Sequence, residues 1–384
     1  MKIMRIDQVC EVNPSKATNL DPNTTISFVP MDSVSTTGHI NLDKTIPVGK
    51  VKNYSVFRNG DIIFAKITPC MENGKGAIVT GLKEGYAAGS TEFIVLRPNT
   101  DIIQREWLYL FLAQKSFRLY CQQHTTGSAG QKRVPPKFLG ACEIPIPSIQ
   151  EQQCTVSRIE ELFSNLDEAL RTLREAKQQL IKYRRAVVKY YLSESCPLSI
   201  EWEQTTVGQV CDCLDNMRKP VKKDKRSTGS GKYPYYGANG RTGSIDNYIF
   251  DEELVLVVED ETFTGRIRPF SYIINGKSWV NNHAHILRGK TGVLDNHFLN
   301  YILAYYPFLP MVTGTTGRKK LTQKALLEAP IRICPYSEQR RVVEQIESRL
   351  SVCDSIEKTV DSSLAQAEAL RQSILRKAFE GRLV

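Results

Sequence analysis

The chain has 384 residues, of which 41% are apolar and 24% are charged, and its mean hydropathy is −0.30. This is the composition of a soluble globular protein, and no run of about 18 apolar residues that could span a bilayer is present. The 51 lysines and arginines exceed the 41 aspartates and glutamates, which gives a net charge of +10 and favours a polyanionic partner.

The N-terminal stretch MKIMRIDQVC lacks the apolar centre of a signal peptide, so we expect a cytoplasmic protein with no membrane partner. Ten cysteines are scattered without a C-x-x-C pair, which argues against a disulfide framework and against a zinc ribbon. Cys211 and Cys213 form a C-x-C pair, which we interpret as buried thiols.

The first globular domain is expected over residues 1–149. Two of its loops combine glycine with cations: KITPCMENGKGAIV at 66–79 and TTGSAGQKRV at 125–134. Backbone N–H groups and hydroxyls in such loops, next to cations, suit a phosphate group. Ordinary solvated hairpin loops are the alternative. The candidate DNA-binding residues here are Lys66, Asn73, Lys75, Ser128, Gln131, Lys132 and Arg133.

A long helix follows, because residues 151–192 contain neither glycine nor proline. Its apolar residues step by three and four, the heptad pattern of a coiled coil, and the pattern is broken at Lys177 and Arg184. We expect a spacer helix over residues 150–195 whose seam consists of Ile159, Phe163, Leu166, Leu170, Leu173, Leu180 and Val187.

The second globular domain is expected over residues 196–335. Its segment at 218–243 combines a basic cluster with aromatic residues and glycines, and amide and guanidinium groups can read base edges. The candidate DNA-binding residues of this segment are Lys222, Lys223, Tyr235, Tyr236, Asn239 and Arg241.

No catalytic constellation is found in the sequence. STGSGKY at 227–233 lacks the residues of a phosphate-binding P-loop, and the carboxylates of EDET at 259–262 lack the nearby lysine of a nuclease strand. His283 and His285 alternate on an expected strand and should face the same side; we favour a structural pair over a metal site. We therefore expect neither a catalytic nor a metal site.

The loop VTGTTGRKKL at 312–321 adds Thr316, Arg318, Lys319 and Lys320 to the candidate DNA-binding residues. A second heptad helix, expected over 336–384, is interrupted at Glu357 and Arg371. Its seam consists of Ile346, Leu350, Val360, Leu364 and Ile374.

The second half of the chain repeats the first. From Gly127 and Gly314 onward the two copies match without a gap at an offset of 187 residues. Two related heptad helices in one chain are expected to pair side by side and antiparallel; separate packing of each helix on its own domain is the alternative. We predict an α+β fold in which two globular domains related by a pseudo-twofold axis are joined by two long antiparallel coiled-coil helices.

Over its whole length the chain resembles the DNA-specificity subunit (HsdS) of type I restriction-modification systems. The resemblance lies in the duplication, in TTGSAGQKRV…IPIPSIQEQQ and VTGTTGRKKL…IRICPYSEQRRVVEQIE with the helices that follow, and in YPYYGANGRTGSIDNYIF. VVEDETFTG at 257–265 departs from the glycine-rich turn of many relatives.

The resemblance implies a non-catalytic subunit with two target recognition domains, each of which reads one half of a bipartite sequence in double-stranded DNA. It also implies that two modification (methyltransferase) subunits dock on the chain, with S-adenosylmethionine bound to them rather than to this chain. Restriction subunits that use ATP and Mg²⁺ would complete the assembly. The remaining alternative is a coiled-coil assembly protein with non-specific DNA affinity.

Overall fold

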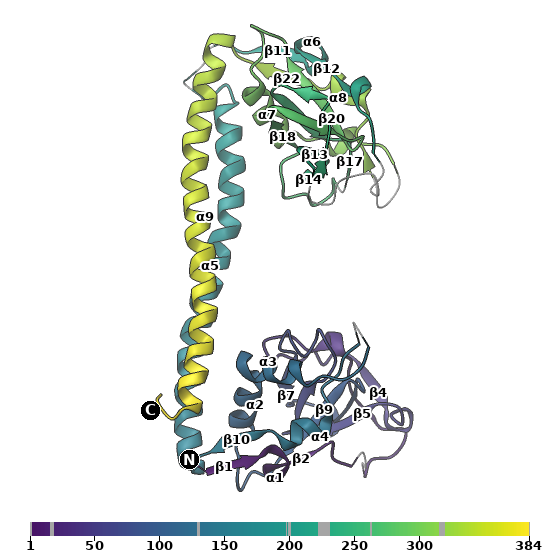
Figure 1. Cartoon of the computed structure of the whole chain (residues 1–384), viewed down its shortest axis with the longest axis vertical. Coiled ribbons are helices and arrows are strands. Elements are labelled where there is room, and N and C mark those ends of the chain that lie inside the picture. The colour runs from purple at the N-terminus through teal and green to yellow at the C-terminus, as the bar shows by residue number, and fades with distance from the viewer. Residues whose placement is uncertain are drawn as a thin grey trace. The chain divides into compact units, whose positions relative to one another are not determined.

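The computed structural model describes residues 2–15, 19–128, 131–196, 198, 201–221, 231–261, 263–314 and 319–383. The chain divides into two compact units (Figure 1). Unit 1 contains Met1–Thr172 and Ser363–Val384, and unit 2 contains Leu173–Ser362. Each unit therefore consists of one sheet-rich domain and one half of each long helix.

Unit 1 contains two four-stranded sheets and a two-stranded sheet. The sheet orders are β2-β9-β6-β7, β4-β3-β8-β5 and β1-β10. The strands are β1 Lys2–Arg5, β2 Cys10–Val12, β3 Thr25–Val29, β4 Thr45–Pro47, β5 Ser55–Arg58, β6 Ile62–Ala65, β7 Gly76–Ile78, β8 Tyr86–Gly89, β9 Phe93–Pro98 and β10 Glu143–Ile146. The short helices are α1 Ile6–Val9, α2 Arg105–Ala113, α3 Lys115–Gln123 and α4 Pro136–Ala141.

Unit 2 contains the sheets β12-β20-β16-β18, β14-β13-β19-β15 and β11-β22, with a further short pair β17-β21. The strands are β11 Glu203–Thr206, β12 Cys211–Cys213, β13 Tyr233–Gly237, β14 Gly240–Ile245, β15 Phe250–Asp251, β16 Leu254–Val258, β17 Asp260–Glu261, β18 Ser271–Ile274, β19 Lys277–Val280, β20 Ala284–Gly289, β21 Lys319–Lys320 and β22 Pro330–Ile333. The short helices are α6 Val207–Val210, α7 Asn296–Ala304 and α8 Gln323–Glu328.

The two units share one topology. The three sheets of unit 1 have counterparts in unit 2 with the same strand order, and in each unit a single parallel pair, β3–β8 or β13–β19, lies within an otherwise antiparallel four-stranded sheet. The sequence repeat is thus a repeat of the complete α+β domain, which confirms the predicted fold class.

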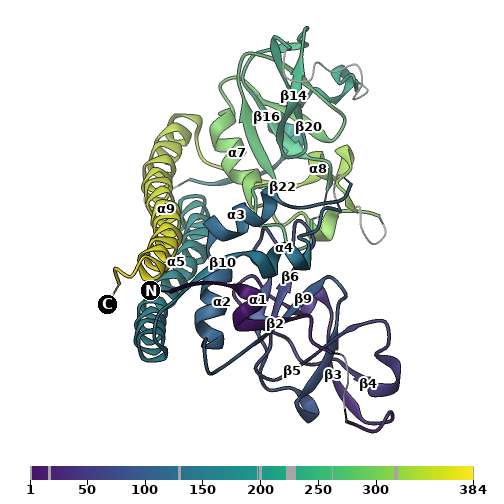
Figure 2. The ribbon, with the colours of Figure 1, turned by 60° about the horizontal axis from the view of Figure 1, so that its bottom comes forward.

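The main core of unit 1 lies between the β2-β9-β6-β7 sheet and its helices (Figure 2). Strands β6 and β9 contribute alternating apolar residues such as Phe64 and Ile94, and α1, α2 and α4 cover them with Ile6, Trp107 and Leu139. All five are at most 1% exposed. Unit 2 builds its main core in the same way, with α6, α7 and α8 over β16 and β20.

The two long helices are α5, Ile149–Tyr191, and α9, Tyr336–Phe379. They lie side by side and run antiparallel (Figures 1 and 2). In unit 2, Lys177 of α5 pairs with Asp361 of α9, and about two turns further along α5, Arg184 pairs with Asp354. Every predicted seam residue is buried or half-buried. The ends of both helices also pack on the domain cores, so helix pairing and packing on the domain occur together.

Polar residues that interrupt the heptads form ion pairs between the helices. Arg371 Nη1 lies 2.7 Å from Asp167 Oδ1 in unit 1, and Arg184 Nη2 lies 2.6 Å from Asp354 Oδ1 in unit 2. Both residues of one pair match the other pair at the 187-residue offset, so the same ion pair is built twice. The breaks in the apolar pattern are therefore contacts that fix the register of the two helices.

A buried glutamine attaches each long helix to its domain. In unit 1, Gln152 accepts a hydrogen bond from Gln104 N and donates to the carbonyls of Ile102 and Pro147. In unit 2, Gln339 repeats this pattern with Asp295 N and two carbonyls. Both side chains are 0% exposed, so their amides can be satisfied only by these backbone groups.

Seven of the ten cysteines are buried, Cys211 among them, whereas Cys70 and Cys213 are half-buried and Cys154 is exposed. The expectation of a buried thiol is therefore met at Cys211 but not fully at Cys213. Burial raises the pKa of the Cys211 thiol to about 12, which keeps it in the unreactive protonated form. None of the described helices is long and apolar enough to cross a membrane.

Candidate nucleic-acid interface

The duplicated Gly-Lys-Arg element forms the same hairpin in both units. Thr126 and Arg133 exchange two backbone hydrogen bonds of 2.9 and 2.8 Å, and Thr313 and Lys320 exchange two of 2.9 and 2.7 Å. Gly127 and Gly314 follow the threonines with φ of +115° and +118°, a conformation that L side chains rarely adopt. The repeated glycine is therefore a requirement of the backbone of this hairpin.

The predicted anchor residues of unit 1 lie on this hairpin. Ser128, Gln131 and Lys132 are exposed, and Arg133 is half-buried. In unit 2, Lys319 and Lys320 lie on β21, whereas Thr316 and Arg318 lie outside the described residues.

The 66–75 loop of unit 1 adjoins the hairpin. Thr68 N donates to Lys132 O over 2.9 Å, and Ile67 forms an isolated bridge with Arg133. Asn73 is exposed, whereas Lys75 Nζ donates to Met31 O over 2.8 Å. The structure thus brings the Lys66 loop and the hairpin together, with Lys75 committed to a backbone carbonyl.

Each hairpin docks on the end of two central strands, and the hydrogen bonds define equivalent positions. In unit 1, Lys66 N donates to Glu92 O over 2.9 Å and Lys66 O accepts from Val134 N over 2.9 Å. In unit 2, Glu259 N donates to His283 O over 3.1 Å and Glu259 O accepts from Leu321 N over 2.8 Å. Lys66 therefore corresponds to Glu259, and Glu92 corresponds to His283. We call this place the strand-end junction.

The last cation of each hairpin pairs with a carboxylate of the strand-end junction. In unit 1, the Arg133 guanidinium contacts both oxygens of Glu92 at 2.9 Å. In unit 2, Lys320 Nζ lies 2.8 Å from Glu259 Oε1. The carboxylate therefore lies at different positions of the junction in the two units, whereas the hairpin cation that pairs with it lies at the same position in both.

These contacts lower the pKa values of both acids. The hydrogen bonds from Arg133 hold the pKa of Glu92 below its ordinary value. Burial acts to raise the pKa of Glu259, but the hydrogen bonds from Lys320 and Arg218 outweigh it, so that this pKa is also lowered. Both acids are therefore charged at neutral pH, and each one neutralises the cation of its hairpin.

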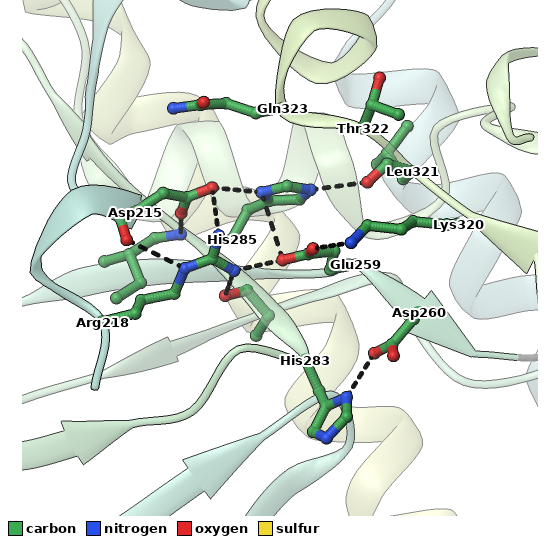
Figure 3. Close-up of polar contacts among 12 residues, drawn as sticks. Asp215, Arg218, Glu259, Asp260, His283, His285, Lys320, Leu321, Thr322 and Gln323 are labelled. Carbon is green, nitrogen blue, oxygen red and sulfur yellow. Dashed lines mark hydrogen bonds and ion pairs between the residues drawn. The ribbon is translucent and has the colours of Figure 1, made fainter. Parts of the chain in front are cut away.

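In unit 2 the junction extends into a buried ion-pair network (Figure 3). Arg218 contacts Glu259 and lies 3.0 Å from Asp215 Oδ2. His285 Nδ1 lies 2.5 Å from Asp215 Oδ2, and its Nε2 lies 2.8 Å from Leu321 O. Both ring nitrogens of this buried side chain therefore have a polar partner.

Asp215, Glu259 and His285 have ligand-type atoms within 4.8 Å of one another, a spacing that could hold a metal ion. However, Arg218 and Lys320 already neutralise both carboxylates. Burial acts to raise the pKa of Asp215, but the interactions with His285, Ile286 N and Arg218 outweigh it, so that this pKa is lowered. The arrangement has the chemistry of a salt-bridge network, in which cations occupy the place of a metal.

His283 and His285 do not form the expected pair. His283 precedes β20 and contacts Asp260 at 2.7 Å with 47% of its side chain exposed, whereas His285 is 1% exposed. Glu259 of the EDET segment pairs with Lys320, which lies 61 positions further along the chain on the adjoining hairpin and not on the same strand.

The prediction of Tyr235 as a DNA contact is wrong. Its ring is 0% exposed within the β13–β14 hairpin, and Val221 N donates to its hydroxyl, so the side chain is structural. Tyr236 is half-buried and packs against Tyr272. Asn239 and Arg241 are exposed near the hairpin turn, where Asn239 accepts from Arg266 and Arg241 donates to Ser244. Lys222, Lys223 and most of STGSGKY lie outside the described residues.

The model of the type I restriction modification DNA specificity domain matches this chain twice, over residues 1–182 and 199–366. The chain belongs to this family. The two matches coincide with the two copies of the α+β domain and the helix that follows each of them.

Members of the specificity-domain family are similar to the chain to different extents. The EcoAI specificity subunit of a type I restriction enzyme from Escherichia coli is 42% identical over 165 residues, which cover 42% of this chain and 28% of that protein. The chain thus matches less than a third of that relative's length.

Two solved structures share the fold over the whole chain. A chain from a structure of a type I R-M system, described for its complex assembly and conformational transition, has a TM-score of 0.80 at 20% identity and covers 100% of this chain and 98% of its own length. The HsdS subunit from Thermoanaerobacter tengcongensis has a TM-score of 0.54 at 21% identity, with coverage of 100% and 97%.

Sequence reasoning missed three groups of residues in this specificity-domain chain. Gln152 and Gln339 had a detectable signal, because they repeat at the 187-residue offset within the duplicated blocks. Glu92 and Glu259 had none, since the acid changes position between the copies. Arg218 was seen only as a member of a basic cluster, whereas it is a buried partner of two carboxylates.

Proposed function

We propose that this chain is the non-catalytic DNA sequence-recognition subunit of a type I restriction-modification complex. One observation carries the proposal: a complete domain with the same glycine hairpin occurs twice, but with different polar residues around that hairpin. A constant hairpin suits contacts to phosphate, which carry no sequence information, whereas variable neighbours suit base readout.

In this proposal, each domain reads one half of a bipartite site in double-stranded DNA. Lys132 and Lys319 would contact the phosphate backbone. Exposed amide and guanidinium groups, such as Asn73 in unit 1 and Asn239 and Arg241 in unit 2, would face base edges. The paired helices α5 and α9 would set the length of the unread gap.

We further propose that two modification subunits dock on the chain and carry S-adenosylmethionine, and that restriction subunits carry ATP and Mg²⁺. No cofactor is assigned to this chain. The complex would work in the cytoplasm, where it meets DNA. The name of the related EcoAI protein as a specificity subunit of a restriction enzyme supports this division of labour.

The test is single-molecule methylome sequencing of cells that express this chain with a modification subunit, compared with cells that lack only this chain. We expect adenine methylation at two short half-sites around a gap of one fixed length, dependent on the chain. The same experiment defines the sequence that each domain reads.

A coiled-coil assembly protein with non-specific DNA affinity makes the opposite prediction. It would leave the methylation pattern without a new motif even though the modification subunit is active and binds the chain. That result would overturn the proposal.

A further inference from the structure

We infer that the carboxylate of the strand-end junction, Glu92 in unit 1 and Glu259 in unit 2, is a positioning residue for DNA recognition. It holds the last hairpin cation, Arg133 or Lys320, away from the DNA backbone and fixes the hairpin to the sheet. Among the hairpin cations that the structure describes, Lys132 and Lys319 then remain as the phosphate-contacting ones. This inference rests on the proposed function and deepens it, because it assigns which hairpin cations bind phosphate.

The first argument is the exchange of charge between the two units. In unit 1 the junction has a lysine at position 66 and an acid at position 92; in unit 2 it has an acid at 259 and a histidine at 283. The acid has changed strands, yet the ion pair with the hairpin is present in both units. Because this contact is kept although the position of its carboxylate acceptor changes, it is required by what the two units have in common, which is the hairpin.

The second argument is electrostatic. A guanidinium that contacts both oxygens of a carboxylate at 2.9 Å presents almost no net charge to a phosphate group. If Arg133 were a phosphate contact, binding would have to break this pair or would bring Glu92 close to the DNA backbone. Lys132 forms no ion pair with any residue that the structure describes, and it is exposed.

The third argument is mechanical. The Arg133 guanidinium also donates through Nη1 to Gln131 O at 3.0 Å, so a single side chain links the hairpin backbone to the start of β9. Arg133 therefore ties the hairpin, which carries Lys132, to the sheet that carries the recognition loops. The contacts of Arg133 would therefore set the distance between the phosphate contact at Lys132 and the base contacts on the recognition loops.

The experiment compares the salt dependence of binding to a mixed-sequence duplex of about 40 base pairs by the purified full chain. Glu92→Gln releases Arg133, which then acts as one additional phosphate contact. We expect the slope of log K against log salt to steepen by about 0.9, so that the loss of affinity between 50 and 200 mM salt grows by about 3.5-fold. Glu143→Gln is the matched control, because it makes the same change in charge at an exposed residue of β10.

The internal repeat supplies a rescue variant. Lys66→Glu combined with Glu92→Lys moves the acid of unit 1 to the position that it has in unit 2 and leaves the net charge unchanged. We expect this double variant to return the salt slope to the wild-type value. A residue that matters only for stability would change the unfolding midpoint instead and would leave the slope of the folded protein as it was.

An unchanged slope in Glu92→Gln, with wild-type protein that binds the duplex, would overturn the inference alone. A slope that steepens equally in Glu143→Gln would do the same, because it would show a general effect of charge. Wild-type protein that fails to bind the duplex even at 50 mM salt would instead contradict the proposed function.

Discussion

Charged residues in the interior of unit 2 depend on one another rather than on solvent. Glu259 and Asp215 have side chains only 6% and 5% exposed, and Arg218 lies between them at 15%. Removal of one partner from such a network leaves the others desolvated and unpaired, which costs more than the pair itself contributes. The network therefore makes unit 2 sensitive to single substitutions.

We predict that Glu259→Gln lowers the free energy of unfolding by about 3 kcal/mol, because Arg218 loses a buried carboxylate. Urea unfolding followed by tryptophan fluorescence measures this. Glu252→Gln is the control: it removes a carboxylate that is 37% exposed and paired with Arg288, whose side chain is 42% exposed, so a loss of less than about 1 kcal/mol is expected. Equal losses in both variants would contradict the buried role of Glu259.

The same network predicts that the folded protein loses stability as the pH becomes acidic. The folded-state pKa of Glu259 lies below its ordinary value of 4.5, so this group stabilises the fold fully above about pH 4.5, and the stabilisation is lost as the pH falls through the folded-state pKa. The groups that face Glu259 are Arg218, Lys320 and His285. We expect wild-type protein to lose more stability than Glu259→Gln between pH 6 and pH 3.5, as measured by urea midpoints at both pH values. Parallel losses would contradict this assignment.

Lys132→Ala and Lys319→Ala test the phosphate contacts. Each substitution is expected to weaken binding to any duplex and to flatten the salt slope by about 0.9, with both half-sites of the methylated motif unchanged. Salt titrations of duplex binding measure the slope. A changed motif with an unchanged slope would mean that these lysines read bases.

At the level of elements, the ion pairs within the helical pair are specific contacts. Arg371 is 23% exposed, pairs with Asp167 and lies 4.2 Å from the centre of the Phe163 ring. We predict a coupling energy of about 1 kcal/mol between Arg371 and Asp167 in a double-mutant cycle on the free energy of unfolding. A parallel cycle on Arg158 and Glu161, an exposed pair within α5, should give about 0.3 kcal/mol. Equal coupling in the two cycles would show that the interhelical pair is only a surface contact.

The elements also show where sequence reasoning works. Heptad spacing over more than 40 residues predicted α5, α9 and their antiparallel pairing, because a sustained apolar stripe needs a partner helix. The sheets carry no comparable local signal: β3 pairs in parallel with β8, some 60 residues away, and only tertiary packing selects that partner. The burial of Tyr235 and the pairing of Arg133 with Glu92 arise from the same long-range choices.

At the scale of the whole molecule, duplication explains most of what the sequence revealed. Features that are equal in both copies, such as the glycine hairpin and the buried glutamines, can be detected as repeats at one offset. Features that differ, such as which of the two strand ends carries the junction carboxylate, are detected only when the fold places Lys66 and Glu259 at equivalent positions. The candidate base-reading residues belong to this second class, which is why the sequence does not reveal the target.

The length of the helical pair is expected to determine the length of the unread gap. Removal of one heptad from α5, within residues 160–189, together with the matching heptad of α9 preserves the seam and the ion-pair register while it shortens the pair by about 10 Å. At about 3.4 Å per base pair, the gap should shorten by up to about three base pairs, with both half-sites unchanged. Methylome sequencing of cells that express the shortened chain with its modification subunit measures the gap length and the half-site sequences together.

Removal of the heptad from α5 alone is the control, since it mismatches the seam and should destabilise the protein rather than define a new gap. Half-sites that change while the gap stays constant would show that the helices do not act as the spacer.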